Sequence, residues 1–152
     1  MILTEKERTV IEDLQTQEKG LVEKYHRCGS EAKDPVLQDL FGELEKMQQK
    51  HYDTLGQVLT GAVPTCDCNC SAGADYAPRA TYTGMSETAD KKNDCFLATD
   101  CIGSEKLAAT EYNTNVFNFQ EPEVRKLLAD IQIEEQNYAE MLYKYKTVNS
   151  MQ

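Results

Sequence analysis

The stretch DPVLQDLFGELEKMQQKHYDTL, residues 34–55, decides the fold because the chain contains its counterpart. Shifted by 87 residues, it lies over EPEVRKLLADIQIEEQNYAEML, residues 121–142, without a gap. Each segment begins with an acidic residue and a proline, which is typical of a helix start, and continues with leucines at helical spacing. The matching register also extends back to Glu18 and Glu105. The sequence therefore predicts a repeated helical unit.

Each repeat unit is predicted to be a pair of helices. Thr4 and Glu7 form the pattern of a capping box, and apolar residues then follow three or four apart. Asp34 and Pro35 mark the start of the second helix, as N-cap and first helical residue. Gly61 marks its end.

Two such hairpins joined by a long connection form an all-α four-helix bundle in one domain, residues 1–152. We expect the first hairpin at about residues 4–60 and the second at about residues 95–147. Residues 61–94 lose helical periodicity and are rich in Gly, Pro, Ser, Thr and Cys. An irregular segment of about 34 residues is long for a compact domain, so we interpret it as a Cys-rich crossover.

Composition excludes several classes of partner. The chain has 152 residues with 26 acidic and 16 basic side chains, a formal net charge of −10. Most of such a surface repels a phosphate backbone, so we expect no nucleic-acid partner. There is no signal-peptide pattern at the start and no apolar run of about 20 residues, so we expect synthesis in the cytosol and no membrane span.

Polar residues occupy positions that the helical spacing turns toward the bundle interior. They pair across the repeat: Glu18 with Glu105, Gln48 with Glu135, and His51 with Tyr138. A dinuclear centre in a four-helix bundle takes one Glu from each of two helices and a Glu-x-x-His pair from each of the other two. The sequence therefore keeps three of the four carboxylates and one of the two imidazoles that such a centre needs.

The two replacements argue against an intact two-metal oxidase or catalase. Gln48 offers an oxygen without charge, and Tyr138 is a poor ligand unless it loses a proton whose usual pKa is about 10. Two divalent ions would keep uncompensated positive charge, and one would lack its nitrogen ligand.

Two interpretations of this polar centre remain. One is a single iron or manganese ion, held by Glu18, His51, Glu105 and Glu135. The other, which we favour, is a metal-free core in which these side chains and their neighbours hydrogen-bond to one another, because buried polar groups need partners. The members of that core would be Glu18, Tyr25, Gln48, His51, Glu105, Tyr112, Glu135 and Tyr138.

The six cysteines divide into two groups. Cys28 and Cys101 fall on apolar helix faces and are expected to be buried small hydrophobic residues. The second group consists of Cys66, Cys68, Cys70 and Cys95. These four could cross-link subunits, or could bind zinc or copper as thiolates, although the C-x-C-x-C spacing is not the usual one for structural zinc.

The stretch GSEKLAATEYNTNVFNFQEPEVRKLLADIQIEEQNYAEMLYKY, residues 103–145, resembles the spore coat protein F family of endospore-forming bacteria. The shared features are the Glu-Lys pair, the acidic-Pro helix start, the Leu-rich turn after it and the EEQ before an aromatic residue. The resemblance implies a ferritin-like four-helix fold. It also implies a structural component of the coat that is laid down around the forming spore in the mother-cell cytosol.

The sequence thus predicts a non-catalytic spore coat or spore-surface protein with a degenerate ferritin-like centre and no cofactor. Its expected partners are further copies of itself and other coat proteins. The alternative is a ferritin-like metalloprotein that handles peroxide or oxygen at an atypical site of one or two metals. Metal content distinguishes the two.

Overall fold

The computed structural model describes residues 1–65 and 71–152. All regular secondary structure in these two ranges is helical, which confirms the all-α prediction. Cys66, Cys68 and Cys70 lie outside the described residues, so the predictions made for them stay predictions.

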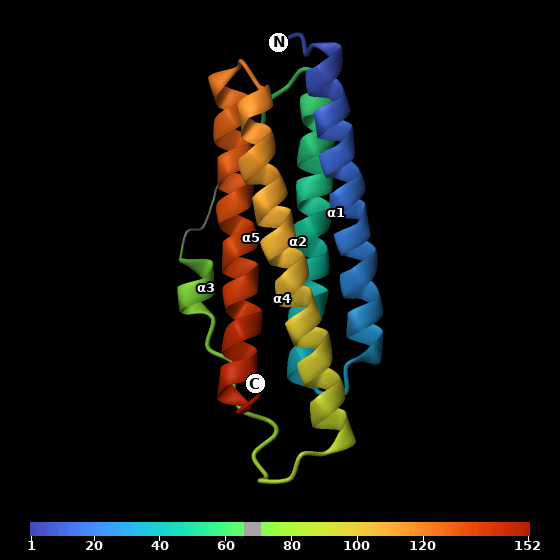
Figure 1. Ribbon diagram of the computed structural model, residues 1–152, viewed down its shortest axis with the longest axis vertical. Coiled ribbons are helices and arrows are strands. Elements are labelled where there is room, and N and C mark those ends of the chain that lie inside the picture. The colour runs from blue at the N-terminus through green and yellow to red at the C-terminus, as the bar shows by residue number, and fades with distance from the viewer. Residues whose placement is uncertain (66–70) are drawn as a thin grey trace.

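Four long helices lie side by side along the molecule (Figure 1). They are α1 (Glu5–Glu31), α2 (Pro35–Leu59), α4 (Ala89–Asn115) and α5 (Pro122–Val148). The short helix α3 (Ala72–Asp75) lies against α5, and a 3-10 turn, η1 (Val116–Asn118), follows α4. Within the described ranges, no helix has the length and apolarity needed to cross a membrane.

The helix starts follow the predicted chemistry. The Thr4 hydroxyl accepts from the Glu7 backbone N–H at 3.2 Å, and Glu7 Oε2 accepts from the Thr4 N–H at 2.8 Å, so the capping box is present. Asp34 Oδ1 accepts from the Val36 N–H at 2.9 Å, and Pro35 follows as the first residue of α2. These caps satisfy N–H groups that the helix itself leaves unpaired.

Helix α4 begins at Ala89 rather than near Cys95, and α3 lies inside the segment expected to be irregular. The first turns of α4 are formed by polar residues. Thr88 caps the helix by accepting from the Lys91 N–H at 3.1 Å, and Lys91 and Asp94 are both buried. Because polar residues occupy the inward positions of these first turns, the apolar periodicity that marks a helix is missing there.

The helices pack as two pairs, α1 with α2 and α4 with α5. Helix α2 ends near the N-terminus of the chain and α4 begins at the opposite end of the bundle, so the connection between them travels the length of the bundle (Figure 1). Asn149 Oδ1 holds the last part of this connection by accepting from the N–H groups of Thr81 at 2.9 Å and Tyr82 at 3.0 Å.

The apolar core is divided into two clusters. One contains Leu21, Leu44 and Leu142, and the other contains Ile11, Leu55, Leu127 and Ile131. Along α1, Glu18 lies between Leu14 of the second cluster and Leu21 of the first, and along α2, Gln48 and His51 lie between Leu44 of the first and Leu55 of the second. Buried polar residues therefore interrupt the apolar core near the middle of these helices.

Candidate functional site

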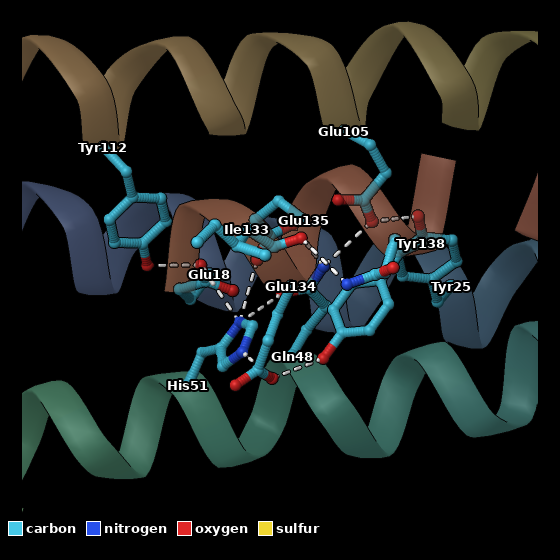
Figure 2. A network of polar contacts seen from close by, with 11 residues as sticks. Glu18, Tyr25, Gln48, His51, Glu105, Tyr112, Ile133, Glu134, Glu135 and Tyr138 are labelled. Atoms are coloured by element: carbon cyan, nitrogen blue, oxygen red, sulfur yellow. Dashed lines mark hydrogen bonds and ion pairs between the residues drawn. The ribbon is translucent and has the colours of Figure 1, made fainter. Parts of the chain in front are cut away.

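The central polar layer draws side chains from all four long helices (Figure 2). Glu18 comes from α1, Gln48 and His51 from α2, Glu105 from α4 and Glu135 from α5. None of the five is more than 3% exposed, which confirms that their helical spacing turns them inward.

Two tyrosines link the helical pairs in a symmetric way. The Tyr25 hydroxyl on α1 donates to Glu105 Oε1 on α4. The Tyr112 hydroxyl on α4 donates to Glu18 Oε1 on α1. Tyr25 and Tyr112 are themselves partners in the sequence repeat, as are Glu18 and Glu105. The repeat therefore relates the two hydrogen bonds to each other: each runs from the tyrosine of one helical pair to the glutamate of the other.

The Gln48 amide bridges two carboxyl groups. Its Nε2 donates to Glu105 Oε1 at 2.9 Å and to Glu135 Oε2 at 2.8 Å, so both N–H groups are used. An amide that donates to two acids supplies the donors that three buried carboxyl groups lack.

The His51 ring lies between two carboxyl groups. Nδ1 is 2.8 Å from Glu135 Oε1, and Nε2 is 3.0 Å from Glu134 Oε2. A neutral imidazole has one N–H, so only the imidazolium donates to both oxygens. Burial alone would lower the pKa of His51, but the hydrogen bonds with Glu134 and Glu135 raise it to about 10. His51 is therefore charged at neutral pH.

Glu134 is a member of the layer that the sequence did not reveal. Besides His51, its Oε2 contacts the Tyr138 hydroxyl, which donates at 2.9 Å. The Tyr138 ring stacks on the His51 ring, with centroids 5.8 Å apart and an angle of 25° between the planes. In the repeat, Glu134 corresponds to the apolar Met47, so the repeat does not indicate a polar role for Glu134. The spacing of four residues from Glu134 to Tyr138 is the signal that could have found it.

The three carboxyl groups differ in charge. Burial, followed by the charge of Glu135, raises the pKa values of Glu18 and Glu105 well above the usual range. Burial alone would raise the pKa of Glu135 too, but hydrogen bonds with Glu105 and His51 lower it. The lowered pKa favours the ionised form of Glu135 beside His51, and the raised pKa values favour the neutral forms of Glu18 and Glu105.

Among the described residues, one group of side chains has the spacing of a cation site. Ligand atoms of Glu18, His51 and Glu135 all lie within 4.8 Å of one another. Glu18 Oε2 has no hydrogen-bonding partner among the described atoms, and Glu134 could orient the imidazole through Nε2–H while Nδ1 binds an ion. A second ion between Glu105 and Glu135 would face the N–H groups of Gln48.

Glu105, the fourth ligand predicted from sequence, does not belong to that group of three. It hydrogen-bonds with Tyr25 and Gln48.

A cavity of about 630 Å³ between α2 and α5 leads to the edge of the polar layer. Its apolar lining includes Leu40, Leu44 and Met141. Glu134 and Tyr138 also line it, and both contact His51. The cavity therefore ends at Glu134 and Tyr138, the two side chains that cover the His51 ring on the α5 side.

Three cysteines lie in the described ranges. Cys28 and Cys101 are buried, as predicted, and Cys95 is half-buried. The Cys95 thiol donates to the Gln152 carbonyl oxygen at 3.4 Å.

Residues 93–149 match the family model of the Coat F domain. The match runs over most of α4 and all of α5, and it supports the resemblance that the sequence of this hairpin suggested. No curated protein and no solved structure matches the chain.

Proposed function

We propose that this chain is a structural spore coat protein, built as a ferritin-like bundle whose metal centre has become a hydrogen-bonded core. The observation that carries the proposal is the Coat F match over residues 93–149. The hydrogen bonds inside the polar layer support a structural role. Both N–H groups of Gln48 and both ring nitrogens of His51 have partners among the protein's own side chains.

Locating the protein tests the proposed role. We expect it to be made in the mother-cell cytosol and then to be recovered in the coat or surface fraction of purified spores, together with other coat proteins. Quantitative immunoblotting of fractionated spores and vegetative cells measures this. Equal amounts in growing cells, with none in the coat fraction, would contradict the proposal.

Self-association is the second part of the proposal, and α4 offers a surface for it. Phe96 is 67% exposed and Leu107 is 61% exposed. They lie about three helical turns apart, so they share one face of α4. Large apolar side chains on an exposed face favour association with another surface.

Sedimentation velocity tests this surface. The double variant Phe96→Glu, Leu107→Glu should remain monomeric at concentrations at which the parent protein associates. The matched control, Gln49→Glu with Gln136→Glu, adds the same charge at exposed positions on α2 and α5 and should associate as the parent does. A monomeric parent protein would contradict self-association.

Cross-linking between subunits is proposed for Cys66, Cys68, Cys70 and Cys95. Cysteines two residues apart rarely reach disulfide geometry with each other, which favours bonds to other chains. Oxidised protein should give a ladder of multimers on non-reducing gels that collapses with reductant. A monomer band in both lanes would contradict cross-linking. Zinc or copper bound in proportion to these thiols would instead favour a thiolate metal site.

A second candidate function is that of a metalloprotein with one iron or manganese ion. The convergence of Glu18, His51 and Glu135 favours it. Such an ion would supply redox chemistry toward peroxide or oxygen, and these three side chains would hold it. Elemental analysis of protein purified without chelator separates the candidates. The structural proposal predicts no stoichiometric metal, whereas one ion per chain that is lost in Glu18→Gln would favour the metalloprotein.

A further inference from the structure

Two cysteines from different helical pairs meet in the core. Cys28 lies on α1 and Cys101 on α4, and their sulfur atoms are 3.6 Å apart. Cys28 is 6% exposed and Cys101 is fully buried. At this distance one thiol donates its S–H to the other, so the two side chains point at each other across the interface between the pairs.

We propose that Cys28 and Cys101 form an intramolecular disulfide, a modification site that joins α1 to α4. A disulfide bond is about 2.05 Å long, so the sulfur atoms must approach by roughly 1.5 Å. Because α1 packs mainly on α2 and α4 mainly on α5, this bond would tie together two pairs that contact each other much less than their own helices do. It would also close a long loop that contains the whole connection from α2 to α4.

The surroundings assign different roles to the two thiols. The hydrogen bond from Cys101 lowers the pKa of Cys28, and the charge of Lys24 acts in the same direction. The same hydrogen bond and burial raise the pKa of Cys101. Lys24 is held in place by Asp100 Oδ2 and Ser104 Oγ, each at 2.6 Å. Cys28 is therefore the thiol that becomes a thiolate, and Cys101 is the thiol that attacks second.

Hydrogen peroxide is the oxidant named in this proposal. The Cys28 thiolate attacks one peroxide oxygen, the O–O bond breaks, and a sulfenic acid and hydroxide form. The Cys101 sulfur then attacks the Cys28 sulfur, and the S–O bond breaks as the disulfide forms. The two departing hydroxide groups, which keep the hydrogens of the peroxide, take up the two thiol protons and leave as two water molecules. One hydrogen peroxide is reduced and two thiols are oxidised by two electrons in all.

The proposal is tested on the full chain with the other thiols removed by Cys66→Ser, Cys68→Ser, Cys70→Ser and Cys95→Ser. After hydrogen peroxide treatment, the protein should lose both free thiols, become lighter by two hydrogens, remain monomeric in mass and yield a peptide linking residues 28 and 101. Closing so long a loop should raise the melting temperature by about 10 °C, and reductant should reverse the change.

Adding Cys28→Ala provides the matched control, because the remaining thiol cannot pair within the chain. Peroxide should not raise its melting temperature. Two thiols that stay titratable after oxidation and unfolding would overturn the proposal, as would sulfinic acids without a linked peptide or a link between two chains. Should the multiple variant fail to fold, peptide mapping of the oxidised parent protein gives the same answer.

Discussion

The two helical pairs make equivalent hydrogen bonds at Glu18 and Glu105, on α1 and α4, but carry different side chains where α2 faces α5. In the shared part, Tyr25 of the first pair donates to Glu105 of the second, and Tyr112 of the second donates to Glu18 of the first. These interactions follow the 87-residue repeat, and exchanging the halves leaves them unchanged. This part of the core keeps the symmetry of a repeated unit.

The symmetry ends where α2 faces α5. Helix α2 carries the donors Gln48 and His51, whereas α5 carries the acceptors Glu134 and Glu135. We propose that this difference lets a layer of metal-ligand type form without a metal ion. One half supplies N–H groups, the other supplies carboxyl oxygens, and the positive charge that a metal would provide is on the imidazolium of His51.

Removing the central acceptor should have the largest effect on this donor–acceptor arrangement. In Glu135→Ala, His51 Nδ1 loses its nearest carboxylate, which leaves it Gln48 Oε1 at 3.1 Å, and one N–H of Gln48 loses its acceptor. We expect the free energy of unfolding to fall by about 3–5 kcal/mol, as for a buried pair with one partner removed. Urea denaturation measures the change. The exposed neighbour provides a control, since Gln136→Ala should change stability by no more than about 0.5 kcal/mol. A loss below about 1 kcal/mol in Glu135→Ala would contradict the role of Glu135 as the central acceptor for the donors of α2.

The proton on His51 should make stability depend on pH. Its pKa is raised from 6.5 to about 10, so above pH 6.5 the folded chain keeps a proton that the unfolded chain loses. The contribution of His51 to stability should therefore be complete below pH 6.5 and fall toward pH 10, by about 1.4 kcal/mol per pH unit.

The raised pKa values of Glu18 and Glu105 act in the same direction, since folding retains their protons above pH 4.5. Denaturation at several pH values and constant ionic strength measures how the free energy of unfolding changes with pH. In His51→Gln, this dependence should correspond to one proton fewer released on unfolding. A constant stability between pH 6.5 and 9.5 would show that His51 is not the charged donor.

Much of this layer could be predicted from the sequence because it depends on local rules. The capping residues Thr4 and Asp34 fixed the helix starts, and helical spacing turned Glu18, Gln48 and His51 inward. The start of α4 does not follow from the apolar pattern, because polar residues occupy the inward positions there, and the repeat does not indicate the role of Glu134, because its counterpart is Met47. Which donor meets which acceptor also depends on packing between helices, which spacing along one helix does not encode.

Placing a carboxyl group at position 48 tests whether α2 must carry donors where α5 carries acceptors. Gln48→Glu makes α2 resemble α5, but it replaces two N–H donors by a fourth acid beside Glu105 and Glu135. We expect a loss of about 2–3 kcal/mol in metal-free protein, from unpaired acceptors and like-charge repulsion. Manganese should recover part of this loss, as measured by thermal unfolding with and without the ion. The exposed Gln49→Glu is the control and should be neutral. A more stable metal-free variant would mean that Gln48 does not act as a donor.

The symmetric contacts should give the smallest and most equal effects. Tyr25→Phe and Tyr112→Phe each remove one hydroxyl donor from a buried carboxyl group. Each should lower the free energy of unfolding by about 1–2 kcal/mol. Urea denaturation of the two variants, side by side, measures whether the halves are equivalent. A difference above about 1 kcal/mol between them would contradict the symmetry of this layer.

The ¹⁵N NMR spectrum of the His51 ring tests the central claim most directly, because it reports whether a proton or a metal occupies Nδ1. It should be recorded at pH 8 on protein purified without chelator, and His26→Gln assigns the signals because the chain has two histidines. If His51 is an imidazolium in a metal-free layer, both ring nitrogens should be protonated and the signals should not change when a chelator is added. A deprotonated Nδ1, or a signal that shifts when a chelator removes a metal, would contradict it.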